Sequence, residues 1–204
     1  MNNIKILLFD FGSVLYKIDL IKTFNAFQNL SEDENFKKSQ DFIDFYSLPL
    51  FLDYECGLIS TNQFLNELEN QFKMYVDKKS LINAWNELLL GLHDNSIKVL
   101  KKLNEKYPLY LLSNTNELHF SYFSMQCKEL FELFEKLYLS FELKTRKPDI
   151  EIFEQILKDL KFLPDEILFI DDLQINLDTA SNLGFNTFLV NDEHDLDKLI
   201  GLLM

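Results

Sequence analysis

Short apolar runs recur along the chain, and each of them stops at a polar residue. These runs cover residues 6–9, 109–112, 137–139, 167–170 and 187–190. Uninterrupted apolar stretches of this length are typical of strands that are buried on both faces of a parallel sheet. Segments with helical signals separate most of them, and this alternation of strand and helix predicts an α/β fold.

Residues that favour helix ends mark three of the separating segments. We predict helices over residues 97–107, 148–160 and 176–183. Ser96 can cap the first of them, and Pro148 suits the first turn of the second. Gly184 is the type of residue that follows a helix, because glycine adopts the left-handed conformation there without strain.

Residues 18–92 break the alternation, because they contain no strand candidate. Ser31 with Glu34 and Ser60 with Gln63 have the spacing of a capping box, which starts a helix. The apolar positions of this segment have helical spacing. They are mostly aromatic, and include Phe24, Phe27, Phe36, Phe42, Phe45, Phe64 and Phe72.

We therefore predict a Rossmann-like parallel-sheet core, formed by residues 1–17 and 93–204, with an α-helical cap of four or five helices inserted at residues 18–92. Within the cap, Gly57 is expected to end a helix that contains Leu52.

Composition and charge exclude some classes of function. The 204 residues are 47% hydrophobic and 26% charged, with a formal net charge of −13 and a pI of about 4.6. No basic cluster stands out, so binding to nucleic acid or to a membrane surface is not expected. No signal peptide and no apolar run of ~20 residues is present. Cys56 and Cys127 are too few for a disulfide framework. We expect a cytoplasmic protein with reduced, buried thiols, as a monomer or a homodimer.

Polar side chains collect where the predicted strands end. They are Asp10, Ser113, Asn114, Asp171 and Asp172, with Lys147 just before a helix. Ligands bind at this edge of open parallel sheets. Crowded carboxylates need a cation, and an all-oxygen site suits Mg²⁺. A carboxylate can attack phosphorus, while a hydroxyl and an ammonium hold the phosphoryl oxygens. Each residue alone is ordinarily a turn or helix cap, so the prediction rests on the whole set.

Four motifs in the same order resemble the haloacid dehalogenase (HAD) superfamily. They are "FDFGSVLYKID", "LLSNTNELH", "RKPDIEIFEQIL" and "LFIDDLQINLDTASNLGFNTFLV". Within that superfamily the chain is more specifically similar to bacterial α-D-glucose-1-phosphate phosphatase and to the N-terminal phosphatase domain of soluble epoxide hydrolases. The stretch "YECGLIS" resembles E-R-G-x-I-S in related caps.

The resemblance implies a role for each strand-tip residue. Asp10 would be the nucleophile, forming an aspartyl phosphate, and also a metal ligand. The other implied Mg²⁺ ligands are the backbone carbonyl of Gly12, Asp172, and Asp171 as a ligand or as the neighbour of one. The residues implied to bind the phosphoryl group are Ser113, Lys147 and Asn114. Asn176 lies where many relatives carry an acid that orients the metal or the lysine.

Two positions depart from the family pattern. Most phosphatases of the superfamily have an aspartate at the position of Gly12, where it acts as the general acid and base. Asp19 and His119 are candidate replacements, although a helix residue bonded to backbone is the more ordinary role for His119. Cys56 stands where related caps often have arginine. Cap aromatics could form a pocket wall, but they are more often core residues; they are Tyr16, Tyr46 and Tyr54.

The leading hypothesis is a Mg²⁺-dependent phosphatase of a small phosphorylated metabolite, such as a sugar phosphate. One alternative is a metal-free 2-haloacid dehalogenase, whose relatives also lack the second aspartate of the first motif. The pair Asp171 and Asp172 argues against it, because that chemistry does not need the two acids. Another alternative is a catalytically silent protein that binds a phosphorylated ligand, and only the missing acid supports it.

Overall fold

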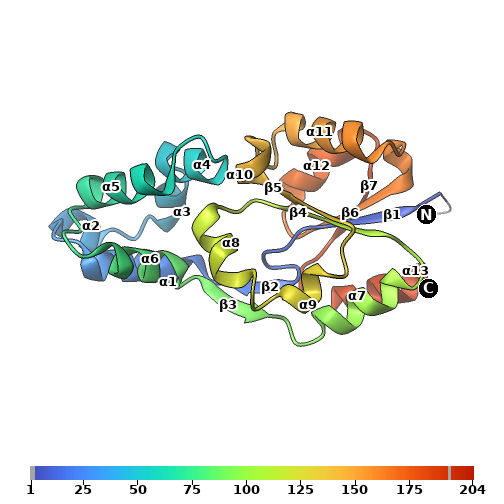
Figure 1. Ribbon diagram of the computed structural model, residues 1–204, viewed down its shortest axis with the longest axis horizontal. Helices are drawn as coiled ribbons and strands as arrows, with labels where there is room; N and C mark the ends of the chain where they lie inside the picture. The colour runs from blue at the N-terminus through green and yellow to red at the C-terminus, as the bar shows by residue number, and fades with distance from the viewer. Residues whose placement is uncertain (1–2, 193) are drawn as a thin grey trace.

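The core of the molecule is a five-stranded parallel sheet (Figure 1) with the strand order β5-β4-β1-β6-β7. The computed structural model describes residues 3–192 and 194–204. The strands are β1 (Ile6–Phe9), β4 (Leu109–Ser113), β5 (Lys136–Leu139), β6 (Ile167–Asp171) and β7 (Asn186–Leu189). Each predicted apolar run therefore forms a strand, and the α/β class is confirmed.

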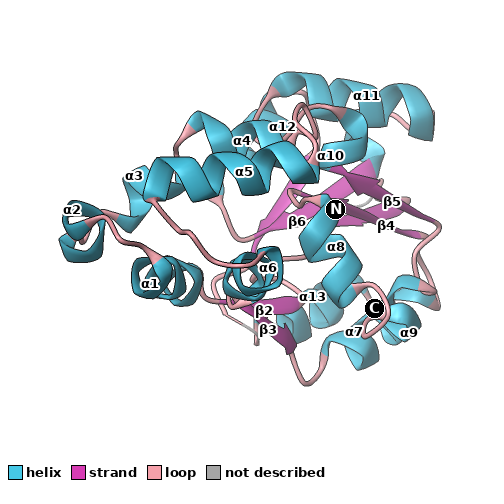
Figure 2. Ribbon diagram, turned by 60° about the vertical axis from the view of Figure 1, so that its left-hand side comes forward, coloured by secondary structure: helices cyan, strands magenta, loops and turns pink. Residues whose placement is uncertain are grey.

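Helices cover both faces of this sheet (Figures 1 and 2). On one face lie α11 (Ile150–Leu160) and α12 (Gln174–Asn182); on the other lie α7 (Ser96–Asn104) and α13 (Asp195–Leu203). Successive β1 residues point to opposite faces. Leu7 and Phe9 join the hydrophobic cluster of α7 and α13, and Ile6 and Leu8 join that of α11 and α12. Burial on both faces explains why these strands are continuously apolar.

Shorter helices complete the core. They are α8 (Glu117–Phe123), α9 (Lys128–Phe131), α10 (Ser140–Leu143) and the 3₁₀ turn η1 (Pro164–Glu166). Of these, α8 follows β4 and α10 follows β5 directly, so both begin at the edge of the sheet where the parallel strands end.

The inserted segment is helical, as predicted, but the described residues form six helices rather than four or five. They are α1 (Leu20–Leu30), α2 (Glu34–Lys38), α3 (Phe42–Tyr46), α4 (Pro49–Glu55), α5 (Thr61–Phe72) and α6 (Lys78–Asn86). The extra count comes from α2 and α3, which have five residues each. Phe27 and Phe51 both stack on Trp85 within a separate hydrophobic cluster. Eight of the 20 phenylalanines belong to this cluster or pack against it.

A two-stranded antiparallel ribbon joins the cap to the core, and this feature corrects the sequence analysis. It pairs β2 (Tyr16–Ile18) with β3 (Leu89–Leu92), so residues 18–92 do contain a strand. These strands have three and four residues, and Gly91 interrupts β3, so no alternating pattern could be read. The ribbon spans the predicted boundary between core and cap at residues 17 and 18, and it ends at the other boundary at residues 92 and 93. The domain boundaries therefore stay a prediction.

The two predicted capping boxes have different outcomes. The Ser60–Gln63 box is present at the start of α5, so that prediction is confirmed. The Ser31–Glu34 box is wrong, because Asp33 caps α2 and its carboxylate accepts hydrogen bonds from backbone N–H groups of the first turn. Ser31 instead ends α1, and its hydroxyl donates to a backbone carbonyl of the cap.

Other predicted helix ends are close to the observed ones. Helix α7 begins at Ser96 itself, with Asn95 as the N-cap. Pro148 lies before the first residue of α11 rather than inside its first turn. Gly57 and Gly184 follow α4 and α12 with φ values of +59° and +93°, as predicted for residues after a helix end.

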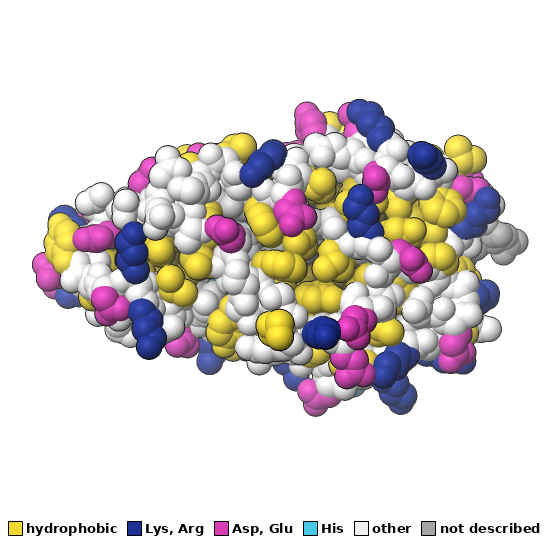
Figure 3. Space-filling model, viewed as in Figure 1, with side chains coloured by type: hydrophobic (Ala, Val, Ile, Leu, Met, Phe, Trp, Pro, Cys, Tyr) yellow, Lys and Arg dark blue, Asp and Glu magenta, His cyan; other side chains and the backbone are white. Residues whose placement is uncertain are grey.

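The surface carries acidic and basic side chains intermingled over the face seen in Figure 3. Among the described residues, no helix has the length and apolar character that a membrane span requires. Cys56 and Cys127 are both free and buried, as predicted.

Candidate active site

The parallel strands bring the predicted acidic residues to one edge of the sheet. Asp10 follows β1, Asp171 is the last residue of β6, and Asp172 comes next. The backbone N–H of Asp10 donates to the carbonyl of Ile170 (2.8 Å), which continues the pairing of the two strands to their tips. One carboxylate oxygen from each of the three aspartates lies within 4.8 Å of the others. The grouping predicted from the strand ends is therefore present.

Lys147 lies inside this group and bridges two of the carboxylates. Its Nζ atom donates to Asp10 Oδ1 at 2.6 Å and to Asp171 Oδ2 at 2.7 Å. The lysine side chain is only 2% exposed. Burial alone would lower the pKa of Lys147, but the two carboxylates outweigh burial and raise it. The ammonium is thus held as a fixed positive charge beside Asp10.

The single positive charge of Lys147 does not balance the negative charge of the three aspartates. Burial raises the pKa of Asp10, Lys147 opposes this rise, and the neighbouring carboxylates add to it. The resulting pKa is about 7. Burial and Asp171 likewise raise the pKa of Asp172. Burial and neighbouring negative charge both disfavour the ionised carboxylate, and a bound cation would favour it. Three clustered carboxylates provide the all-oxygen donor set that Mg²⁺ prefers, so the residues fit this ion.

Asp171 is positioned by its own hydrogen bonds. It is fully buried, and its Oδ1 accepts from the Leu173 backbone N–H (2.8 Å) and from Asn176 Nδ2 (2.9 Å). Its Oδ2 is the atom bonded to Lys147. Both carboxylate oxygens are therefore engaged in hydrogen bonds within the protein, and one of these bonds orients the lysine. Of the two roles that the sequence left open for Asp171, this geometry favours the neighbour of a ligand over a ligand.

The residues predicted to bind the phosphoryl group meet at the same edge. Ser113 is the last residue of β4 and is 3% exposed. The Asn114 side chain forms two hydrogen bonds of 2.9 Å with the backbone of Lys147, donating to its carbonyl and accepting from its N–H. Asn114 thereby fixes the lysine loop next to β4. Direct contact of Ser113 and Asn114 with a phosphoryl group stays a prediction.

The loop after β1 contributes a residue that the sequence analysis missed. Ser13 has a left-handed φ of +58°. Burial raises the pKa of Asp172, and the Ser13 side chain partly offsets that rise. The Gly12 carbonyl accepts from the Val14 N–H at 2.7 Å, which leaves its second lone pair as the predicted metal-binding position. A serine in a left-handed turn is an unusual backbone conformation that sequence alone does not reveal.

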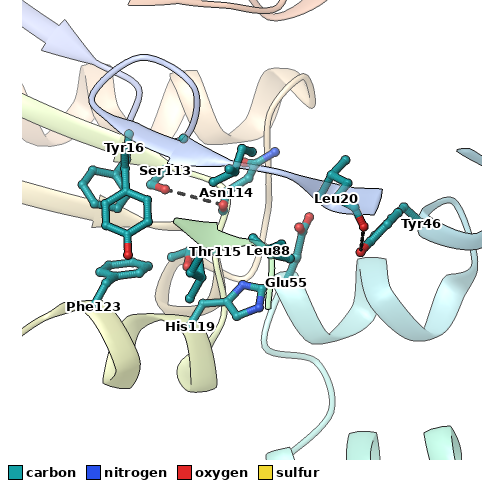
Figure 4. A pocket seen from close by; sticks show the side chains of 14 residues that line it. Tyr16, Leu20, Tyr46, Glu55, Leu88, Ser113, Asn114, Thr115, His119 and Phe123 are labelled. Carbon is teal, nitrogen blue, oxygen red and sulfur yellow. Dashed lines mark hydrogen bonds between the residues drawn. The ribbon is translucent and has the colours of Figure 1, made fainter. Parts of the chain in front are cut away.

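A cavity of about 100 Å³ opens beside these residues, between the core and the cap (Figure 4). Gly12, Ser113 and Asn114 line its floor, and Tyr16, Tyr46 and Phe123 are among its mainly apolar walls. Tyr16 and Tyr46 are thus wall residues. Tyr54 does not line it among the described residues, and instead stacks on Phe64 in the cap core.

Neither candidate replacement for the missing acid is free to act. Asp19 caps α1, where its carboxylate accepts from the Ile21 N–H. His119 lines the cavity, but its Nδ1 is bonded to Asn116 and its Nε2 to the Trp85 carbonyl. Burial lowers the pKa of His119 to about 4. The ordinary role that was favoured for His119, a helix residue bonded to backbone, agrees with this geometry.

The cap sends one carboxylate into the cavity, and the sequence analysis passed over it. Glu55, the last residue of α4, lines the cavity, whereas its neighbour Cys56 does not line it among the described residues. Figure 4 shows the Glu55 carboxylate pointing into the space next to Asn114 and Leu20. Its Oε2 forms an ion pair with Arg146 Nε at 2.9 Å. The only sequence signal was its place in "YECGLIS", where attention fell on Cys56.

Comparison with known proteins places this geometry in context. A family model of haloacid dehalogenase-like hydrolases matches residues 4–184. The chain is 33% identical over 195 residues, 91% of each protein, to D-ribitol-5-phosphate phosphatase of Bacteroides thetaiotaomicron. It is 36% identical over 81 residues, 38% of this chain and 14% of the relative, to bifunctional epoxide hydrolase 2 of Rattus norvegicus.

A solved structure extends the similarity to nearly the whole fold. It is a HAD family enzyme of Bacteroides thetaiotaomicron in complex with magnesium and inorganic phosphate, with a TM-score of 0.84 and 34% identity. The alignment covers 96% of this chain and 98% of that one.

Proposed function

This chain belongs to the haloacid dehalogenase-like hydrolases, as its four motifs indicated, and from that premise we propose that it hydrolyses a small phosphorylated sugar or sugar alcohol. It is an enzyme of the phosphoric monoester hydrolase type, and Mg²⁺ is its cofactor. The residue roles and the substrate are the proposed part.

One observation carries the proposal, namely the bridge that Lys147 forms between Asp10 and Asp171. Asp10 is 7% exposed, and it lies two residues before Gly12, which lines the cavity. A nucleophile held by a buried ammonium, with Asp172 within 4.8 Å, is the arrangement that phosphoryl transfer to a carboxylate requires.

In the proposed mechanism, a carboxylate oxygen of Asp10 attacks phosphorus in line with the scissile bond and forms an aspartyl phosphate. The Lys147 ammonium and the Ser113 hydroxyl hold the phosphoryl oxygens, where charge spreads in the transition state. Asn114 and Asn176 position the lysine and Asp171. When bound, Mg²⁺ would be held by Asp10, Asp172 and the Gly12 carbonyl, and it would supply positive charge that reduces the repulsion between the carboxylate and the phosphoryl group. Water then hydrolyses the aspartyl phosphate.

The cavity and the relatives support the proposed substrate class. A cavity of about 100 Å³ between cap and core suits a small metabolite rather than a polymer. D-Ribitol-5-phosphate phosphatase, at 33% identity over 91% of both chains, supports a phosphorylated sugar alcohol or sugar.

A phosphatase screen tests the proposal directly. Purified protein with Mg²⁺ is assayed on sugar phosphates, sugar alcohol phosphates and p-nitrophenyl phosphate, with and without EDTA. We expect phosphate release that is lost with EDTA and in Asp10→Asn, but kept in Asp178→Asn. Asp178 is a matched control because it is an exposed aspartate of α12, away from the strand tips.

Two other outcomes would favour the alternatives. Chloride release from 2-chloropropionate that EDTA does not affect would indicate a dehalogenase. Binding of inorganic phosphate without turnover of any ester would indicate a silent binding protein.

A further inference from the structure

The position of Gly12 leaves the reaction without its usual general acid, and the cavity shows which side chains could replace it. In an in-line displacement, the leaving oxygen lies on the side of phosphorus opposite the attacking Asp10 oxygen. That side faces the cap. A replacement acid must therefore be a titratable residue that lines the cavity, and the described residues with that property are Tyr16, Tyr46, Glu55 and His119.

Three of these four side chains are poorly suited to transfer a proton. His119 has both ring nitrogens hydrogen-bonded within the protein and is neutral. The Tyr46 hydroxyl donates to the Leu20 carbonyl at 2.9 Å (Figure 4), and burial raises its pKa. Burial also raises the pKa of Tyr16 to about 12. A tyrosine of that pKa is a weak acid for catalysis near neutral pH.

Glu55 is held rigidly although it comes from the cap. Arg146, the residue before the catalytic lysine, contacts Oε2 of Glu55 at 2.9 Å. The Ser140 hydroxyl donates to the Glu55 backbone carbonyl at 2.7 Å. Both its side chain and its backbone are thus tied to core residues near the strand tips. The ion pair uses one carboxylate oxygen, which leaves Oε1 available to a substrate atom.

The surroundings of Glu55 also suit proton transfer. Burial raises the pKa of its carboxyl, and Arg146 partly offsets this effect. Glu55 is in addition the last residue of α4, where the negative end of the helix dipole disfavours a carboxylate. A raised pKa favours the protonated carboxyl, which is the form that a general acid must have.

We propose that Glu55 is the general acid and base of this phosphatase, supplied by the cap in place of the residue missing at Gly12. In the first step, an Asp10 oxygen bonds to phosphorus while the bond from phosphorus to the substrate oxygen breaks. The electron pair stays on that oxygen, which takes the proton of the Glu55 carboxyl and leaves as an alcohol.

The second step reverses the proton transfer. The Glu55 carboxylate takes a proton from water as the water oxygen bonds to phosphorus. The bond from phosphorus to Asp10 breaks, which restores the Asp10 carboxylate, releases inorganic phosphate and leaves Glu55 protonated again. This inference rests on the proposed phosphatase function.

Rapid-mixing kinetics of Glu55→Gln with two kinds of ester test the assignment. p-Nitrophenolate is a good leaving group that needs no proton, whereas a sugar alcohol does need one. We therefore expect Glu55→Gln to release about one equivalent of p-nitrophenolate per enzyme in a fast burst, followed by slow turnover as the aspartyl phosphate accumulates. On sorbitol 6-phosphate or ribitol 5-phosphate, kcat should fall by ~10²–10⁴-fold without a burst.

Two further variants separate catalysis from structure. Glu67→Gln, on an exposed position of cap helix α5, should behave as wild type. Glu55→Asp retains a carboxyl, so it should turn over the alkyl phosphate faster than Glu55→Gln even if both variants lose thermal stability. This comparison also decides the matter if Glu55→Gln folds poorly.

Several results would overturn the assignment. Glu55→Gln could keep a kcat on alkyl phosphates within about threefold of wild type, or could show a rise in KM alone. It could lose equal activity on aryl and alkyl esters without a burst. Glu55→Asp could turn over the alkyl phosphate no faster than Glu55→Gln. If wild type with Mg²⁺ releases no phosphate from any ester, the proposed function itself fails. If wild type is active and depends on Asp10, and Glu55→Gln matches it, only the role of Glu55 fails.

Discussion

Replacing Lys147 by methionine should destabilise the metal-free protein strongly. The substitution keeps the length of the side chain but removes the ammonium that lies 2.6 Å from Asp10 and 2.7 Å from Asp171. Removing one partner of a buried ion pair typically costs about 3–5 kcal/mol, because a buried charge is left uncompensated. For a chain of this size, that corresponds to roughly 6–20 °C in Tm.

The assay is urea and thermal unfolding in EDTA, with Lys136→Met as the matched control. Lys136 contacts Asp159 at the same 2.7 Å distance, but the two side chains are 50% and 47% exposed. An exposed pair of this kind contributes about 0–1 kcal/mol. Both variants remove an ammonium from ion pairs of similar length. Lys147 is buried and bridges two carboxylates, whereas Lys136 is half-exposed and pairs with one.

Added Mg²⁺ should restore part of the stability of Lys147→Met, because a bound cation replaces the lost charge beside the carboxylates. Ligand that binds only the folded state at about 100 times its Kd adds ~2.7 kcal/mol. Activity should nevertheless stay low, by ~10²–10³-fold in kcat, since the phosphoryl oxygens lose a fixed donor. The reasoning is wrong if Lys147→Met in EDTA is as stable as Lys136→Met, or if Mg²⁺ stabilises it no more than wild type.

Two other substitutions test how the fold is held together. Gly57→Ala should lower the free energy of unfolding in urea by about 2–5 kcal/mol, because a Cβ at φ +59° is strained and would lie 2.3 Å from the Phe141 carbonyl oxygen. The control Gly201→Ala, in open space within α13, should be neutral or stabilising by up to about 1 kcal/mol. Equal effects of the two substitutions would contradict the packing argument. The Lys198 ammonium, together with the backbone N–H and the side-chain amide of Asn191, holds the pKa of Asp195 well below its usual range. The contribution of Asp195 to stability is therefore present above the unfolded pKa of about 4 and is lost as pH falls through the folded pKa. The difference in free energy of unfolding between wild type and Asp195→Asn should narrow from about pH 7 to about pH 2. A difference that does not depend on pH would exclude this linkage.

Much of the core could be predicted because its signals are local. A strand such as β1 that is buried on both faces must be apolar at every position, so its bounds are visible in the sequence. Parallel strands end at a common edge, which placed Asp10 near Asp171 and Asp172 before any coordinates were known. Gly57 and Ser60 marked helix ends because capping depends on a few neighbouring residues.

Short elements were less predictable. The ribbon of β2 and β3 was missed because strands of three and four residues carry too few positions for a periodic pattern. Asp33 displaced Ser31 as the cap of α2, since several acceptors compete in that turn and tertiary contacts decide among them.

The sequence by itself determined the class of fold and the acidic edge of the sheet, because hydrophobic periodicity is local and parallel strands end at a common edge. The family resemblance of its motifs supplied the nucleophile candidate. Only the tertiary structure decided that Lys147 reaches Asp10 across 137 positions of the chain, that Asn114 clamps the lysine loop, and that the cap delivers Glu55 to the cavity. Each of these depends on where packed elements place a side chain in space. Such contacts join segments that lie far apart in the sequence, and no local pattern encodes them.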